Sequence, residues 1–360
     1  MLNIKSKTVL LPLLIALPTF GLQANNEDVS KEALQTELNQ IRLRLATLEE
    51  QEKTDDKAGE QSQSLSNSIN FYGSLRPTFG VTMSGSDDVW DVGDALSRIG
   101  IAADQELGYG LTGFAKGEFK VNIQANGDFG EARKAYVGIK GDFGRVAIGK
   151  QSSTQYRFIA DPVDIFNRAA TPLAYDSASP FRVNNLVTYR KDFGDVSFSV
   201  DSQFDGDNDS DFFNTGLVYN GDLLRAAVAY YSKESYDIDA FNGVKEQTGI
   251  GVSVAKSFGD LYLAASYQGT EVNSVDGSTL DLVGAYAITE IYKLKLGASS
   301  FDDGIDDMSS GNYNAYNTTL EWQGTADFRL FLEYQKTDFE HRDADDSIMV
   351  GMRYDFDYKF

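Results

Sequence analysis

The chain has 360 residues, of which 42% are apolar and 24% are charged, with 33 glycines, 6 prolines and no cysteine. Its formal net charge of -22 argues against a nucleic-acid partner, because such binding needs clustered Lys and Arg to neutralise phosphates. The lack of cysteine excludes disulfides, reactive thiols and zinc-thiolate sites. No apolar run after the first two dozen residues is long enough for a helical span, so the composition favours an all-β chain over a helical membrane protein.

Residues 1–24 predict a secretory signal peptide. Lys5 and Lys7 precede an apolar run from Val9 to Leu22, and Ala24 is a suitable residue before a cleavage site. The run is too short and too interrupted by proline to be retained as a membrane span. We therefore expect the mature chain to begin near Asn25, in the periplasm.

Residues 25–52 predict a short periplasmic helix that forms a coiled coil. The apolar positions fall on the three-and-a-half-residue period of a heptad seam, between charged flanks. A frayed polar tail is the alternative, because an isolated helix of this size is marginal in water. Residues 53–68 are polar, have no apolar period and predict a linker. The seam positions are Leu34, Leu38, Ile41, Leu45 and Leu48.

From residue 69 to the end, strand-like runs alternate with two kinds of connection. Short Gly- and Asp-containing turns are expected at 106–110, 141–144, 191–195, 220–222, 258–260 and 324–327. Longer polar loops are expected at 85–93, 152–182, 205–211, 233–245, 269–278, 302–312 and 338–346. Short turns at one end and long loops at the other are typical of outer-membrane barrels, with the long loops outside. Counting the runs predicts about sixteen antiparallel strands, whose lumen is too wide for side chains to fill.

The last stretch, Ser347–Phe360, is the clearest single strand. Apolar and aromatic residues occupy every second position from Ile348 to Phe360, and mostly charged residues occupy the positions between them. Side chains of a strand point alternately to its two faces, so one face is apolar and the other is polar. About ten residues of tilted strand cross a bilayer, and aromatic girdles mark its interfaces. The stretch therefore predicts a membrane-spanning strand with lipid on one side and water on the other.

Several segments resemble Gram-negative outer-membrane barrels. The terminal Phe360, with Tyr358 and Phe356 behind it at every second position, is similar to the assembly signal of these barrels. Residues 71–73, 96–100, 131–139 and 141–149 are similar to segments of the general diffusion porins, and with the terminal strand they cover the chain from about Asn70 onward. The resemblance implies a trimeric, 16-stranded barrel in the outer membrane that lets ions and small hydrophilic solutes diffuse passively.

The long loop at 152–182 is the candidate constriction. In the resembling porins the loop after the fifth strand lies against the inner wall of the barrel, and here Asp161 and Asp164 are the acidic residues expected to line the pore, with Asp176 as a further possibility. Apolar residues at 158–159 and 165–166 are expected to anchor the loop. An external loop without a role in conduction is the alternative, although a long apolar loop in water is costly.

The wall across from the loop is expected to be basic. Alternation on the strands places Arg76, Arg98 and Arg190 inside, whereas on the fourth strand it leaves Arg133 and Lys134 as alternatives. The family pattern favours Arg133, and it puts Arg98, Arg133 and Arg190 in the basic row. Arg76 lies two residues beyond the family's usual basic position. For each arginine the alternative is a wall residue that is paired locally, away from the constriction.

The sequence has no catalytic signature, cofactor motif or metal motif. The only histidine, His341, falls in a polar loop, and the Asp-rich run 205–211 lacks the Gly and Glu of a calcium-binding EF-hand loop. We therefore predict a channel without catalytic residues, cofactor or metal. Its expected partners are outer-membrane lipid and lipopolysaccharide, two further copies of the chain, the barrel assembly machinery and, through the coiled coil, the cell wall. A structural tether of the envelope and a channel specific for a sugar or phosphate are the alternative functions.

Overall fold

The computed structural model describes residues 67–85, 87–124, 129–167, 180–204, 211–236 and 244–360. The predicted signal peptide, coiled coil and nearly all of the linker lie outside these residues. Among the described residues, no helix is long and apolar enough to cross a membrane.

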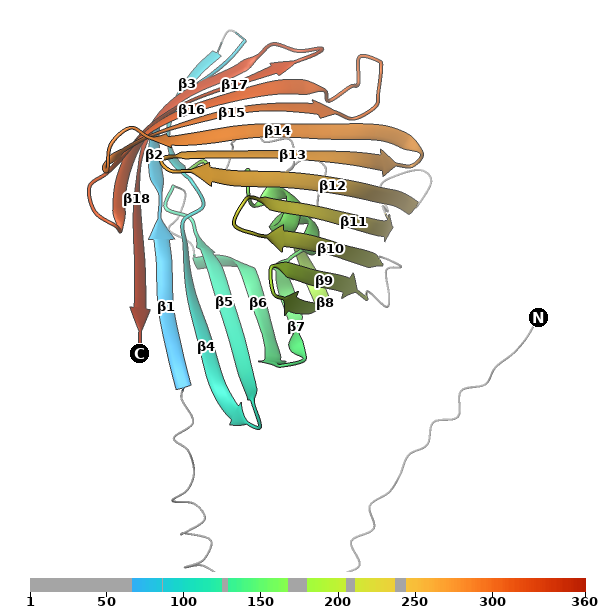
Figure 1. Cartoon of the computed structure of the whole chain (residues 1–360). Coiled ribbons are helices and arrows are strands. Elements are labelled where there is room, and N and C mark those ends of the chain that lie inside the picture. The colour runs from blue at the N-terminus through green and yellow to red at the C-terminus, as the bar shows by residue number, and fades with distance from the viewer. Residues whose placement is uncertain (1–66, 86, 125–128, 168–179, 205–210, 237–243) are drawn as a thin grey trace, which may run out of the picture. The chain divides into compact units, whose positions relative to one another are not determined.

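The described residues form one antiparallel sheet that closes on itself (Figure 1). β1 with β2, and β3 with β4, each form one bent barrel strand, so the eighteen segments make a closed barrel of sixteen strands, as the sequence predicts. The segments are β1 (Asn67–Leu75), β2 (Pro77–Ser84), β3 (Asp87–Asp94), β4 (Arg98–Gly108), β5 (Leu111–Val121), β6 (Phe129–Gly141), β7 (Gly144–Ser152), β8 (Arg182–Phe193), β9 (Val196–Gln203), β10 (Phe212–Asn220), β11 (Arg225–Tyr236), β12 (Val244–Phe258), β13 (Leu261–Val272), β14 (Val275–Ala287), β15 (Tyr292–Asp302), β16 (Tyr313–Gln323), β17 (Phe328–Phe339) and β18 (Asp345–Lys359).

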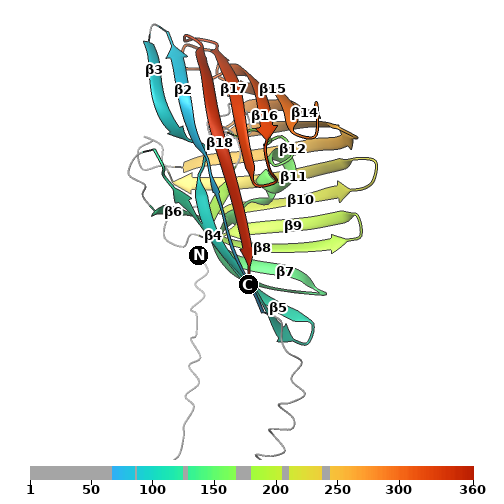
Figure 2. The ribbon, with the colours of Figure 1, turned by 90° about the vertical axis from the view of Figure 1, so that its left-hand side faces the viewer.

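The barrel is closed by its first and last strands. β1 pairs with β18 in the register Phe71↔Tyr358, and the backbone groups of Ile69 and Phe360 exchange two hydrogen bonds of 3.1 and 2.8 Å. In Figures 1 and 2, strands β9–β14 run across the direction of β1, β4 and β18, because tilted strands on opposite walls of a barrel cross. This closure leaves the sheet without an exposed edge.

Alternation along the strands separates a lipid face from a water-filled lumen. On β16, the outward Tyr316 and Leu320 are 48% and 42% exposed, whereas the inward Asn317 and Thr319 are buried among polar neighbours. The same alternation runs along β18, where the outward residues are apolar as the sequence predicts. Apolar side chains thus face outward and polar ones inward, the reverse of a soluble sandwich.

Two of the predicted long loops are wrong. Residues 87–94 form β3, which pairs with β2, so the connection at 85–93 is largely strand. Residues 269–278 belong mostly to β13 and β14, which are joined by Asn273 and Ser274, both with positive φ. The polar composition of these segments belongs to the strand ends, and a two-residue turn with left-handed backbone suits the twist of a hairpin.

Candidate functional site

Residues 153–167, here called the inner loop, leave the wall after β7 and return across the inner face of the barrel. At their start, the backbone N–H of Thr154 donates to Asp201 Oδ2 on β9 (2.5 Å), and that of Gln155 donates to Asn214 Oδ1 on β10 (2.6 Å). The Gln155 side chain donates to Gln268 Oε1 on β13 (2.8 Å). All five side chains are fully buried, so these bonds form without competition from water.

Inward side chains of further wall strands hold the middle of the inner loop. Arg225 on β11 donates from Nη1 to the carbonyl of Phe158 (2.9 Å) and from Nη2 to the carbonyl of Arg157 (3.0 Å). Tyr262 on β13 donates its hydroxyl to the carbonyl of Pro162 (2.7 Å). The loop therefore follows the wall strand by strand rather than crossing free space.

A buried ion pair fixes the far end of the inner loop. Lys295 Nζ on β15 lies 3.0 Å from Glu321 Oε2 on β16 and donates to the carbonyl of Ile165 (3.0 Å). Asn167 donates from Nδ2 to the same Glu321 oxygen (2.9 Å). The two charged side chains are only 8% and 1% exposed, so each depends on the other for compensation.

Replacing Lys295 by Met is expected to destabilise the folded barrel by about 3–5 kcal/mol, because Glu321 would keep a buried charge without its lysine. Arg329 Nη1, 3.7 Å from Glu321 Oε1, compensates in part and favours the lower end of that range. Urea unfolding of the detergent-solubilised barrel measures the change. Lys293→Met, on the same face of β15, is the matched control, and equal midpoints for the two variants would contradict the assignment.

Apolar contacts add to these bonds, and they confirm that the loop folds inward as predicted. Phe158 and Ile159 pack on small residues of β10 and β11, and Phe166 packs on β12–β14 with Ile165 beside it. Two wall glycines leave the room for this packing. A Cβ at Gly251 would lie 2.9 Å from Ile159 Cγ2, and one at Gly297 would lie 2.7 Å from Phe166 Cζ.

Asp161 and Asp164 are the exceptions on a loop that is otherwise mostly buried. Both are exposed to the lumen, whereas Pro162 and Val163 between them are buried against the wall. Asp164 accepts a hydrogen bond from the Tyr156 hydroxyl (2.7 Å), which holds its carboxylate in place. The structure therefore brings the two predicted acidic residues together on the lumen side of the loop. Asp176 lies outside the described residues.

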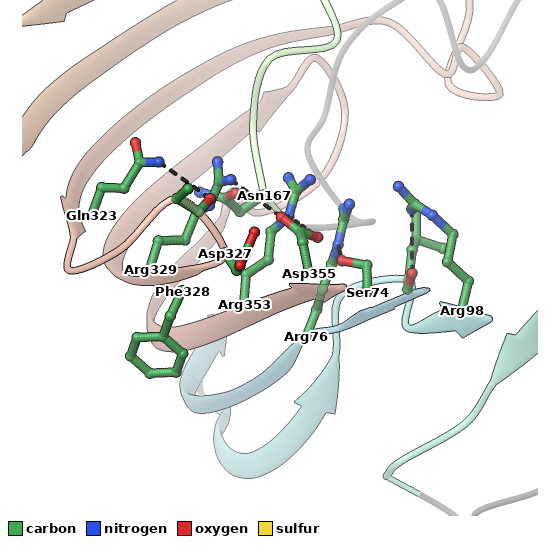
Figure 3. A network of polar contacts seen from close by, with 12 residues as sticks. Ser74, Arg76, Arg98, Asn167, Gln323, Asp327, Phe328, Arg329, Arg353 and Asp355 are labelled. Atoms are coloured by element: carbon green, nitrogen blue, oxygen red, sulfur yellow. Dashed lines mark hydrogen bonds and ion pairs between the residues drawn. The ribbon is translucent and has the colours of Figure 1, made fainter. Parts of the chain in front are cut away.

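A row of arginines continues along the wall from the far end of the inner loop, where Asn167 and Arg329 both contact Glu321 (Figure 3). Arg76 donates from Nε to Ser74 Oγ (2.7 Å). It also lies close enough to Arg98, Arg133 and Arg353 for electrostatic repulsion between the guanidinium groups. Ser74 pairs in register with Arg98 on β4, which sets the two arginines at similar heights. The structure thus brings together three of the four predicted basic residues.

The ambiguity between Arg133 and Lys134 is resolved by a β-bulge. β6 pairs Lys134 with Glu118 and Ala132 with Phe119, so Arg133 is the extra residue on its strand. Arg133 Nε reaches Glu118 Oε1 at 3.0 Å in a buried ion pair, and Lys134 faces the lumen on the regular alternation. Both side chains therefore point inward, which strict alternation excludes.

Arg190 lies apart from the row. It sits on β8 at the base of the inner loop, where it donates to Ser199 Oγ (3.3 Å) and to the carbonyl of Ser152 (3.4 Å). These contacts place it beside the origin of the loop rather than across from it. We therefore leave Arg190 out of the arginine row.

Sequence reasoning missed two members of the row. Arg353 on β18 pairs in register with Arg329 on β17, and Asp355 Oδ2 accepts from both, at 2.8 and 3.2 Å. Figure 3 shows the guanidinium groups of Arg329, Arg353, Arg76 and Arg98 side by side. The signal was the charged face of the terminal strand, to which Arg353 belongs.

Comparison with known families agrees with this geometry. A family model described as "Gram-negative porin" matches residues 58–357. The chain is 25% identical over 253 residues to a "Monosaccharide porin" of a Halomonas species, covering 62% of this chain and 69% of the relative. It is 24% identical over 292 residues to "Outer membrane protein U" of Vibrio parahaemolyticus, covering 72% of this chain and 83% of the relative.

Solved structures show the same fold. OmpF of Salmonella typhi, in complex with daunomycin, superimposes with a TM-score of 0.70 at 17% identity, covering 80% of this chain and 97% of that one. An anion-selective porin from Comamonas acidovorans superimposes with a TM-score of 0.66 at 18% identity, covering 81% and 100%. At these identities the likeness is one of fold.

Proposed function

Because this chain belongs to the Gram-negative porin family, a family of outer-membrane channels and not enzymes, we propose that the inner loop and the arginine row form the constriction of its diffusion pore. One observation carries the proposal. The loop is held by β9–β16 and exposes Asp161 and Asp164, whereas the arginines come from β17, β18, the β1–β2 junction, β4 and β6. Acidic and basic groups therefore come from the two complementary parts of the wall.

Such an arrangement suits passage rather than tight binding. Two unit charges 4 Å apart interact by about 1 kcal/mol in water, and by several times that amount where low-dielectric walls focus the field. A field of this strength orients a dipolar solute and sorts ions by charge without trapping them, as conduction requires. Reversal potentials in a salt gradient test the selectivity, and neutral sugars of rising size measure the width of the throat.

A sugar-specific channel is the second candidate, and the similarity to the Halomonas monosaccharide porin supports it. A specific channel would show ion current that saturates with one sugar and not with others of equal size. A general pore would discriminate only by size and charge. Titrating glucose, arabinose and a disaccharide of glucose against the open-channel current separates the two.

The partners belong to the same proposal. One of the structural neighbours, OmpT of Vibrio cholerae, is described in a trimer form, which supports a homotrimer here. We also propose contacts with lipopolysaccharide, the assembly machinery and, through residues 25–52, the cell wall. Deleting residues 28–52 tests the last contact: envelope fragility with unchanged single-channel conductance would favour a tethering role beside conduction.

The terminal residues of β18 supply the proposed assembly signal. The Phe360 side chain is 79% exposed, and Phe356 and Tyr358 stack near it with ring centroids 6.2 Å apart. Deleting Phe360 is expected to lower the amount of folded barrel in the outer membrane while the purified chain still refolds in detergent. Heat-modifiable gel mobility measures both quantities. Normal insertion in cells would contradict the assignment.

A further inference from the structure

A cavity of about 450 Å³ lies between the inner loop and the wall strands β6–β11. Asp192, Ser197 and Asn220 in its lining flank the short β8–β9 and β10–β11 connections. Short turns of outer-membrane barrels face the periplasm. The cavity is therefore on the periplasmic side of the loop, where a solute arrives after it has passed the constriction.

The lining of this cavity carries an excess of positive charge. Two carboxylates, Asp161 and Asp192, contribute to it, and Asp192 already accepts a hydrogen bond from the Ser197 hydroxyl. The cations outnumber them by five to two, and they are Lys134, Arg145, Arg157, Arg190 and Arg225. In a chain of net charge -22, this local excess is unusual and needs a physical reason.

Among the described residues, these arginines form no ion pair, and Asp161 acts on Arg157 and Arg225 only from beyond ion-pair distance. Arg225 and Arg190 donate to carbonyl and hydroxyl oxygens, which satisfy hydrogen bonds but carry no formal charge. The Arg145 guanidinium lies 4.0 Å from the centroid of the Phe114 ring. Within the described part of the chain, the Arg157 guanidinium has no hydrogen bond or ion pair. It is partly buried and repelled by Arg145, and the more distant carboxylates of Asp201 and Asp161 offset part of that repulsion.

We propose that this cavity is a binding subsite for a small organic solute that carries one oxyanion group, a carboxylate or a phosphate. Arg145 and Arg157 hold the oxyanion, because the planar guanidinium fork matches both groups and their mutual repulsion is relieved by an anion between them. The Tyr136 ring, on the inner face of β6, offers apolar surface to the carbon body of the solute. The volume falls in the range of about 300–1,000 Å³ that is usual for small-molecule sites.

The subsite adds a solute class to the proposed function and rests on it for the position of the loop in the conduction path. A weak site just beyond the throat raises the local concentration of anionic solutes there, and it still releases them because a conducting site must not bind tightly. The site is also one-sided. A solute added from the periplasmic side reaches it without crossing the constriction.

Solute block of single-channel current in planar bilayers tests the proposal, with glucose 6-phosphate, gluconate and glucose as probes. We expect glucose 6-phosphate and gluconate to reduce the current saturably, at lower concentration from the periplasmic side, and glucose to have no saturable effect. Arg145→Gln/Arg157→Gln should raise the half-blocking concentration at least about tenfold, because charge-assisted hydrogen bonds are lost. Arg145→Lys/Arg157→Lys, which keeps the charge but not the fork, should fall between.

Arg98→Gln/Arg353→Gln is the matched control, because it removes the same charge from the arginine row outside the cavity and keeps Arg329, which lies 3.7 Å from the loop-anchoring Glu321. It should shift the reversal potential and leave the half-blocking concentration of the anions unchanged. The experiment can therefore contradict the proposed constriction and the proposed subsite independently of each other. If only one probe anion blocks, that group is the ligand chemistry. Equal block by glucose, or unchanged block in Arg145→Gln/Arg157→Gln barrels that run as folded species on gels, would overturn the proposal.

Discussion

Asp161→Asn/Asp164→Asn channels are expected to shift their reversal potential toward anion preference. Both carboxylates are exposed to the lumen on a loop whose backbone is fixed by buried hydrogen bonds, so the substitutions change the charge and leave the loop in place. Each charge near a passing ion is worth about 1 kcal/mol in water, which corresponds to a change of about fivefold in the cation-to-anion permeability ratio. The measurement is the reversal potential in a salt gradient.

Arg98→Gln/Arg133→Gln is the reciprocal variant and should shift the selectivity toward cations. Arg133 is paired with Glu118, so its removal frees a buried carboxylate as well as deleting a cation, and both changes favour cations. The control is Asp260→Asn, which removes a carboxylate from the short β12–β13 turn, away from the arginine row, and should leave the potential near that of the unmodified channel. If neither pair of variants moved the potential, the constriction would have to be assigned to other residues, although the barrel would stand.

The fold was predictable because the alternation of side chains and the composition of the connections are local signals. The terminal strand, the even number of strands and the lumen too wide to fill all follow from a period of two and from short turns at one end. Polar composition was a poorer guide at 85–93 and 269–278. β3 has an apolar outward face, with Trp90 65% and Val92 48% exposed, but the aspartates around these positions give the segment the composition of a loop.

The sequence predicted a constriction with an acidic loop and a basic wall, but not the full set of residues that form the wall. Alternation says which face of a strand a residue occupies, and it correctly placed Arg76 and Arg98 inside. It could not reveal the bulge that turns Arg133 inward, because a bulge is an exception to alternation. It also gives no height along the barrel. The register between neighbouring strands puts Arg329 and Arg353 in the row and Arg190 outside it. The sequence of one strand does not reveal its register with the next.

Gly251→Val/Gly297→Val channels, in which the two wall glycines under the inner loop gain side chains, are expected to conduct less and to close more often. Added side chains would meet Ile159 and Phe166, which are almost fully buried between loop and wall. Overpacking of this kind costs about 1–3 kcal/mol at each site, and the loop can relieve it only by moving into the lumen, since the sheet behind it is closed. A loop displaced in that direction narrows the throat, so single-channel conductance and the largest permeating sugar should both decrease.

Gly269→Val on β13 separates this effect from the general cost of replacing glycine in a strand. A Cβ at Gly269 would meet nothing closer than Ile250 Cγ2 at 4.0 Å, and its neighbours Gln268 and Thr270 take the inward positions. The residue therefore gains a side chain on the outer face, away from the loop, and its conductance should match that of the unmodified channel. Equal conductance in all three channels would mean that the wall glycines do not seat the loop, whereas a larger conductance in the double variant would mean that the loop leaves the throat instead of narrowing it.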